Sequence, residues 1–246
     1  MNDQSVKDQN TTATPIPISL RGSAPLHSSS ISKAKWTGGI QIQDLDFRYE
    51  NEMVLQKFSA FIPQGKMTCI IGSNGAGKTT LLKLIAGLLR PKCGKIEFNG
   101  FSATTPTISY FRQFHELDRQ FPLRVIDIVG LSHADFTPWR LSFHPARHEN
   151  CLKNLDRLGI KDLKDHFLSE LSQGQIQRVY LARFLAQHSE ILLLDEPFNF
   201  IDHKTQTEML TILRELQTAG KTIIAIMHPN PQLSLPFDYQ IFLGPQ

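Results

Sequence analysis

The segment 72–80, GSNGAGKTT, combines three glycines with a lysine and two threonines at a spacing that suits phosphate chemistry. It ends the apolar run MTCIIG and opens the run KTTLLKLIAGLL, in which apolar residues recur at helical spacing. Glycines in such a loop let backbone N–H groups point inward around a phosphate, and the helix N-terminus adds a partial positive charge. A plain glycine-rich turn is the alternative, but the strand and helix on either side favour a phosphate-binding loop.

Two residues of this loop have a predicted chemical role. We expect Lys78 to reach the β and γ oxygens of a bound nucleotide and Thr79 to offer its hydroxyl to Mg²⁺. The predicted binding residues of the loop are Gly72, Ser73, Asn74, Gly75, Ala76, Gly77, Lys78, Thr79 and Thr80.

Two adjacent carboxylates end another apolar run, ILLLDEP at 191–197. A strand that ends there places them at the carboxyl edge of a parallel sheet, where ligands bind. We expect Asp195 to hold Mg²⁺ through its water shell and Glu196 to act as the general base that polarises the attacking water. The alternative is a capped strand end, which the phosphate-binding loop makes the weaker interpretation.

The segment LSQGQIQRVYLARFLA, at 171–186, places a Ser/Gly/Gln turn before a helix, and Ser172 alone would be a good N-cap. Together with the loop before it and the Asp-Glu pair after it, the turn resembles the LSGGQ-like signature of ABC transporter nucleotide-binding domains. Gln173 replaces the first glycine of that signature, whereas Ser172, Gly174 and Gln175 match it. We expect this replacement to be tolerated.

The resemblance, which covers about Ile40 to the C-terminus, implies that two ATP molecules are held in a head-to-tail dimer. The signature of one protomer would press on the γ-phosphate bound by the other, as suits a helix N-terminus that attracts anions. The resemblance also assigns roles to single positions by their place in the family's sequence pattern. Two neighbouring residues depart from that pattern: Arg112 stands where proline is common, and Pro229 stands where aspartate is frequent. The assigned positions are Tyr49 for stacking on adenine, Gln113 for Mg²⁺ and water, Asp202 for the loop across the dimer interface and His228 for the γ-phosphate.

Each of these positions also has a structural interpretation. Tyr49 would otherwise be a strand aromatic, Gln113 a surface polar residue and His228 a histidine at a strand end. Their order along one chain favours function. His144 and His148, four residues apart, would suit a metal site, but Pro145 separates them and no carboxylate or cysteine completes the set, so a solvated helix face is preferred.

The elements that must position these residues follow from hydrophobic periodicity. IQIQDLDFRY, VLQKFSAFI, GKIEFNG and TISYFRQ predict strands. PLRVIDIVGLSH, ARHENCLKNLDRLGI and LKDHFLSEL predict amphipathic helices between about 114 and 171. A helix at 176–187, the strand ILLLDE, a helix at 204–219 and the strand KTIIAIMH follow. We therefore expect an α/β P-loop NTPase core of mainly parallel sheet, with an antiparallel β subdomain and an inserted helical subdomain.

Composition limits the remaining possibilities. Residues 1–36 are rich in Ser, Thr and Pro and predict a disordered tail without a signal peptide, so the predicted nucleotide-binding domain spans 37–246. The chain has 246 residues and a formal net charge of +3, which is too small a bias to indicate nucleic acid. No apolar run approaches the roughly 20 residues that cross a bilayer. Cys69, Cys93 and Cys151 are expected to be reduced packing residues of a cytosolic protein.

The resemblance implies that the chain is the ATP-hydrolysing subunit of an ABC transporter, at the cytoplasmic face of the membrane. Its expected partners are a second copy, separate permease subunits and an extracytoplasmic substrate-binding protein, with no nucleic acid. The stretch LDRQFPLRVIDIVGLSH at 117–133 resembles the ATPases of zinc, manganese and iron-chelate importers. The alternative is a soluble ABC ATPase of DNA repair or translation, and a non-hydrolysing homologue would be expected to lack Glu196 or His228.

Overall fold

A computed structural model of the chain describes residues 38–50, 52–111, 122–131, 145–198, 203–227 and 237–244. The side chains of 145–147 and 203–204 are not described. The predicted tail at 1–36 and the predicted site residues Gln113, Asp202 and His228 lie outside these ranges.

The described strands form two sheets. The first is antiparallel in the order β2-β1-β4, and its strands are β1 (Gly39–Tyr49), β2 (Glu52–Pro63) and β4 (Cys93–Asn99). The second is parallel in the order β5-β6-β7-β3-β8. Its strands are β3 (Met67–Gly72), β5 (Ile108–Phe111), β6 (Ile191–Asp195), β7 (Thr222–Ile226) and β8 (Tyr239–Leu243). A mainly parallel α/β core with an antiparallel subdomain is therefore confirmed.

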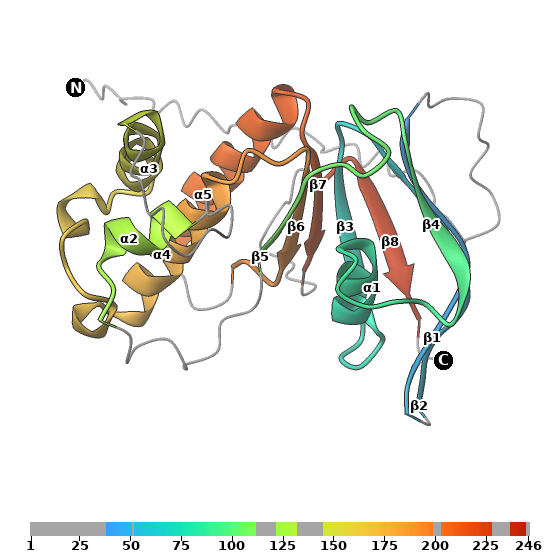
Figure 1. Ribbon diagram of the computed structural model, residues 1–246. Helices are drawn as coiled ribbons and strands as arrows, with labels where there is room; N and C mark the ends of the chain where they lie inside the picture. Colours follow the sequence, from blue (N-terminus) through green and yellow to red (C-terminus); the bar gives the residue numbers. More distant parts are fainter. Residues whose placement is uncertain are drawn as a thin grey trace, which may run out of the picture.

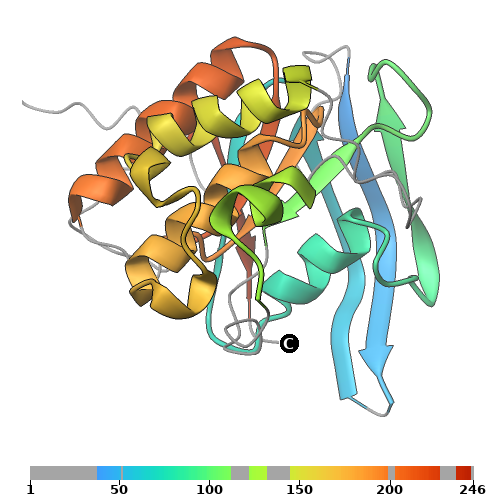
Figure 2. The ribbon, with the colours of Figure 1, turned by 60° about the vertical axis from the view of Figure 1, so that its left-hand side comes forward.

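The helices lie in two layers on opposite faces of the parallel sheet (Figure 1). Helix α1 (Lys78–Ile85) lies between the parallel sheet and the antiparallel sheet. The other helices gather beyond the opposite face (Figure 2). They are α2 (Val125–Gly130), α3 (Pro145–Arg157), α4 (Gln173–Leu185) and α5 (His203–Thr218). Two short 3₁₀ turns, η4 (Lys161–Leu163) and η5 (Leu168–Glu170), connect α3 to α4.

Each face of the parallel sheet has its own hydrophobic core. On the α1 side, Leu81 and Leu82 pack with Ile70 of β3 and with Ile40 and Ile42 of β1, all fully buried. On the other side, a second core joins the sheet to α2, α3, α4 and α5. Since the residues of β6 and β7 are buried along their whole length, those two strands are apolar on both faces, as is typical of a parallel sheet covered by helices.

Helix α1 ends earlier than its apolar pattern predicts. Gly87 has a left-handed backbone (φ 71°), and the N–H of Leu88 donates to the oxygen of Lys83 at 2.9 Å. The N–H of Gly87 itself donates to Leu84 at 3.1 Å, which completes a Schellman C-cap. The glycine therefore ends the helix, although the helical spacing of apolar residues in KTTLLKLIAGLL continues beyond it.

The segment LKDHFLSEL is not the amphipathic helix that its pattern predicts. Its backbone oxygens serve a neighbouring helix, because the N–H groups of Val125 and Ile126 donate to His166 (3.0 Å) and Lys164 (2.9 Å). These bonds satisfy orphan donors at the first turn of α2. The segment itself forms the 3₁₀ turn η5, and its first residue, Leu163, ends η4.

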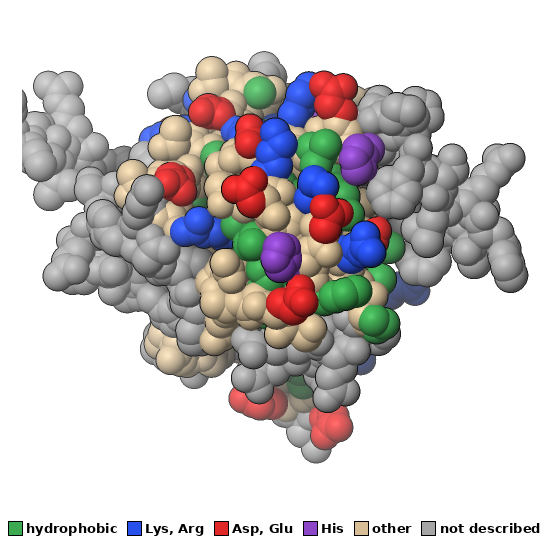
Figure 3. Space-filling model, turned by 90° about the vertical axis from the view of Figure 1, so that its left-hand side faces the viewer, with side chains coloured by type: hydrophobic (Ala, Val, Ile, Leu, Met, Phe, Trp, Pro, Cys, Tyr) green, Lys and Arg blue, Asp and Glu red, His purple; other side chains and the backbone are tan. Residues whose placement is uncertain are grey.

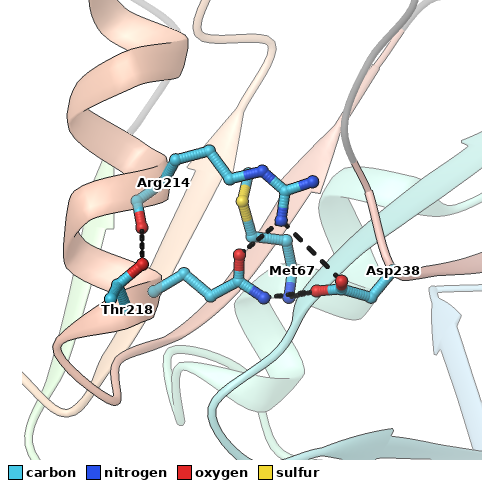
Figure 4. Close-up of polar contacts among 5 residues, drawn as sticks. Met67, Arg214, Thr218 and Asp238 are labelled. Carbon is cyan, nitrogen blue, oxygen red and sulfur yellow. Dashed lines mark hydrogen bonds and ion pairs between the residues drawn. The ribbon is translucent and has the colours of Figure 1, made fainter.

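Asp238 ties three elements together just before β8 (Figure 4). Its Oδ2 accepts a hydrogen bond from the backbone N–H of Met67, at the start of β3, at 2.8 Å. The same oxygen accepts from the amide of Gln217 on α5, and Arg214 lies 3.7 Å from Oδ1. The contact fixes the entry to β3, the strand that leads into the phosphate-binding loop.

The three cysteines are free, as expected, but they do not share one environment. Cys69 and Cys151 are buried and pack in the core, whereas Cys93 is exposed at the start of β4. The prediction that all three are packing residues is therefore wrong for Cys93.

Candidate functional site

The predicted phosphate-binding loop joins β3 to α1 in a compact turn. Gly75 and Gly77 have left-handed backbones, with φ of 82° and 88°. Ser73, Asn74 and Gly75 are exposed, so the tip of the loop faces solvent. A Cβ on Gly77 would lie 2.9 Å from Val54 Cγ1 and 3.1 Å from Val54 O, so only glycine lets the loop approach β2 this closely.

The amine of Lys78 is held over this loop. Lys78 is 7% exposed, and its Nζ donates to the backbone oxygens of Gly72 and Ser73, each at 2.8 Å. A buried ammonium group needs such acceptors, and in this position it brings a positive charge to the loop's inner edge. Thr79 and Thr80 follow in the first turn of α1.

The carboxylate of Asp195 lies next to the first turn of α1. Thr79 Oγ1 donates to Asp195 Oδ1 at 3.1 Å, although 116 residues separate the two in sequence. Asp195 is 2% exposed, and this burial raises the pKa of its carboxyl, an effect that hydrogen bonds from Tyr110 and Thr79 oppose. The parallel sheet thus brings together the hydroxyl and the carboxylate that the sequence assigned to one metal.

Glu196 follows at the end of β6 in an uncommon conformation. Its φ is 50°, in the left-handed region that costs a non-glycine residue roughly 1–2 kcal/mol. Its side chain is half-buried, and the next residue, Pro197, is buried. Strained residues of this kind persist where the surrounding structure holds them, and they cluster at functional sites.

The predicted signature turn forms the N-terminus of α4. Ser172 is its N-cap: Ser172 Oγ accepts from the N–H of Gln175 at 3.3 Å, and Gln175 Oε1 accepts from the N–H of Ser172 at 2.9 Å. This reciprocal pair is a capping box, and the predicted N-cap is confirmed. The helix begins at Gln173, before the predicted Ile176. Ser172 and Gln173 are exposed, and a Cβ on Gly174 would meet nothing within 4 Å, so this helix end is open to a ligand.

Tyr49 lies at the end of β1, where β1 and β2 form a hairpin and Tyr49 pairs with Glu52. It is 43% exposed, and its ring meets that of Phe47 edge-on, with centroids 4.9 Å apart. Val54, which contacts the phosphate-binding loop, lies two positions further along the paired strand. An exposed aromatic face is thus available near the loop.

Two residues that no sequence motif includes contact the segment from Asp195 to Pro197. The hydroxyl of Tyr110 on β5 donates to Asp195 Oδ2 at 3.0 Å. The buried amide of Gln177 on α4 donates to the backbone oxygen of Pro197 at 3.4 Å. Tyr110 lies three positions before Gln113 in the predicted strand, but its contact with Asp195 depends on the pairing of β5 with β6, which the sequence does not specify.

The donor set at Asp195 suits a magnesium ion. It offers a buried carboxylate and a hydroxyl beside a lysine-bearing phosphate-binding loop, and Mg²⁺ prefers oxygen ligands from one or two carboxylates together with substrate phosphates. Thr79 and Asp195 would hold it, and the ion would neutralise charge on the phosphates.

Comparison with known proteins identifies the family. The ABC transporter family model matches residues 55–199, which include the phosphate-binding loop, the signature turn and the Asp-Glu pair. The chain belongs to the ABC transporter family. It is an ATP-binding subunit of an ABC transporter and an ATPase, and the DNA-repair or translation alternative is not supported.

Two curated relatives show how closely the chain resembles family members. The zinc transport system ATP-binding protein TroB of Treponema pallidum is 34% identical over 83% of this chain and 78% of the relative. The manganese transport system ATP-binding protein MntB of Listeria monocytogenes is 35% identical over 83% and 86%.

Solved structures share the fold. An inward-facing ABC transporter described as metal-chelate type is 26% identical, with a TM-score of 0.71 over 84% of this chain and 79% of that one. A nucleotide-free ATP-binding cassette is 21% identical, with a TM-score of 0.71 over 84% and 87%. The latter likeness shows the fold alone. Among the helices of the described residues, none has the length and the apolar composition that a membrane span requires.

Proposed function

We propose that this ATPase binds Mg²⁺-ATP at the loop between β3 and α1 and hydrolyses it with Glu196 as general base. The observation that carries the proposal is the Thr79–Asp195 contact of 3.1 Å, which brings a hydroxyl and a carboxylate that would hold Mg²⁺ close to the loop that carries the Lys78 amine. Gly72 to Thr80 would hold the phosphates, and Tyr49 would stack on adenine. Gln113 and His228 would complete the catalytic set, and Asp202 would lie at the dimer interface.

The chain is proposed to act as a head-to-tail homodimer. The capped N-terminus of α4 is exposed at Ser172 and Gln173, and its backbone N–H groups favour an anion. In a dimer the partner's ATP would bring its γ-phosphate to Ser172, Gly174 and Gln175. ATP would then hold two chains together, and hydrolysis would release them.

The proposed task is transport of a transition metal, zinc or manganese, or of an iron chelate through separate permease subunits. Supporting observations are the names of the relatives, which are zinc and manganese transport ATPases, and the metal-chelate type of the transporter with a similar fold. The permease would place the chain at the cytoplasmic face of the membrane, and an extracytoplasmic binding protein would deliver the cargo to it.

Nucleic acid is not among the proposed partners. Figure 3 shows positive and negative side chains interspersed on the face that α2, α3 and α4 help to form. Binding to a phosphate backbone favours a continuous basic surface, and the net charge of +3 is small.

Purification of the tagged chain from membranes tests this function. A co-purified polytopic protein, with ATPase activity of the complex stimulated by Zn²⁺, Mn²⁺ or an iron chelate, is the expected result. A soluble ribosomal or DNA-bound partner would overturn the assignment to transport. A membrane complex whose ATPase activity did not respond to Zn²⁺, Mn²⁺ or an iron chelate would overturn the assignment of the cargo.

A further inference from the structure

We propose that Tyr110 is a positioning residue for magnesium binding: its hydroxyl holds the carboxylate of Asp195 in the orientation that the metal requires. This inference rests on the proposed function above and adds a residue that the sequence motifs do not include. It follows from three features of the site.

The first feature is the register of β5 against β6. Tyr110 pairs with Leu193, and its hydroxyl reaches Asp195 Oδ2 at 3.0 Å. The side chain therefore advances by two residues along the neighbouring strand, about 6.6 Å at the usual rise of a parallel strand. A phenol spans that distance, whereas the shorter side chains of serine and threonine do not.

The second feature is that the two donors come from different elements. Asp195 Oδ1 accepts from Thr79 on α1, and Oδ2 accepts from Tyr110 on β5. Asp195 is only 2% exposed, so its carboxylate depends on donors from the protein. Contacts at both oxygens fix the rotation of the carboxylate, and each oxygen keeps a lone pair for a further partner.

The third feature is the difference between the two donors. Thr79 is the proposed metal ligand, so its oxygen must serve Mg²⁺ when the ion binds. Tyr110 is not among the proposed metal ligands, and its ring packs against the core between α1 and the sheet, which restricts its movement. It is therefore suited to orient a ligand from outside the coordination sphere, a role whose loss costs about 10–100-fold in metal affinity in other proteins.

The test measures how strongly Mg²⁺ tightens ADP binding, because a binding ratio is independent of turnover. Calorimetry on the full chain gives the Kd for ADP with EDTA and with Mg²⁺. The ratio of the Kd in EDTA to the Kd in Mg²⁺ measures how strongly the ion tightens binding. Tyr110→Phe is expected to lower this ratio about tenfold and to leave the Kd in EDTA unchanged. Tyr180→Phe, which makes the same chemical change on α4 in the opposite core, should leave the ratio unchanged.

A double variant isolates the contact with Asp195. In an Asp195→Asn background, Tyr110→Phe should have no further effect on the ratio, because the group that it positions has changed. An unchanged ratio in Tyr110→Phe would overturn the inference. A raised Kd for ADP in EDTA would also overturn it, because the hydroxyl would then stabilise the fold of the site rather than position Asp195 for the metal. If the wild-type chain bound no ADP, or bound it without regard to Mg²⁺, the proposed function itself would fail.

Discussion

The amide of Gln177 on α4 donates a hydrogen bond to the backbone oxygen of Pro197, the residue that follows Glu196, at 3.4 Å. Gln177 is 7% exposed and lies on the helix that begins after Ser172. The proposed contact with a partner's ATP and the proposed catalytic base of the same chain are thus connected through one buried side chain.

Substituting Gln177→Leu should lower kcat about tenfold and leave the Kd for ATP unchanged. The substitution leaves the Pro197 oxygen without this donor, which costs about 1–3 kcal/mol, and it loosens the backbone that aims Glu196. Steady-state ATPase assays and equilibrium nucleotide binding measure the two effects. Gln217→Leu is the matched control, because its amide contacts Asp238 beside Met67, at the end of β3 opposite to the phosphate-binding loop: this variant should lose stability and keep its kcat. Equal kcat in Gln177→Leu and the wild-type chain would contradict the role given to Gln177.

The left-handed backbone at Glu196 predicts that the residue at this position lowers the stability of the folded chain unless it is glycine. Glu196→Gly and Glu196→Ala both remove the carboxylate, but only glycine adopts a φ of 50° without strain. Glu196→Gly should therefore be more stable than Glu196→Ala by about 1 kcal/mol in urea unfolding, with both variants inactive. If alanine were the more stable of the two, the backbone strain would not exist in solution.

Two glycines of the phosphate-binding loop should respond differently to the same substitution. Both have a left-handed backbone, but a Cβ at Gly75 meets nothing within 4 Å, whereas one at Gly77 lies 2.9 Å from Val54 Cγ1. Gly77→Ala should therefore lower the free energy of unfolding by at least about 1 kcal/mol more than Gly75→Ala. A denaturant titration of the two variants measures this difference, and equal losses would show that loop and strand β2 do not pack this closely.

The sequence predicts those elements that are specified by residues close to one another along the chain, and it fails where a contact between distant segments decides the structure. The apolar runs of β6 and β7 and the Ser172 cap are local patterns, and the structure contains them as predicted. The segment LKDHFLSEL was predicted wrongly because the N–H groups of Val125 and Ile126 on another helix take its backbone oxygens. Strand β8 was not predicted, because its five residues, YQIFL, are partly exposed and form no continuous apolar run of the kind that β6 and β7 have.

The same distinction holds within the site. The predicted loop and Asp-Glu pair carry recognisable residue spacings, and a parallel sheet brings them together. The contact of Tyr110 with Asp195 spans 85 residues and depends on the register of β5 against β6, which no local pattern specifies. Gln177 is one of several polar residues on α4, and only the packing of the helix shows which of them meets Pro197.

The cysteines predict a pH dependence with a definite sign. Burial raises the pKa of the Cys69 thiol from its ordinary value of 9.0 to about 12. Between these two values the unfolded chain releases a proton that the folded chain keeps, so stability should fall as pH rises above about 9. The slope should approach 1.4 kcal/mol per pH unit, roughly the value for one proton, and it should be smaller in Cys69→Ala.

Alkylation offers an independent check on the same thiols. With iodoacetamide at pH 8, the exposed Cys93 should be modified in the folded chain, while the buried Cys69 and Cys151 should react only after denaturation. Mass spectrometry of the peptides distinguishes the three. Rapid modification of Cys69 in the folded chain would contradict its place in the core.

The most direct test of ATP hydrolysis by Glu196 is the Glu196→Gln variant, mixed with Mg²⁺-ATP and followed for both turnover and size. Loss of the general base should lower turnover by at least about a hundredfold, while the phosphate-binding loop still holds ATP. Light scattering should then show a stable dimer with ATP trapped between two chains. Hydrolysis at the wild-type rate in this variant would contradict the assignment of Glu196 as the base, and with it the proposed mechanism.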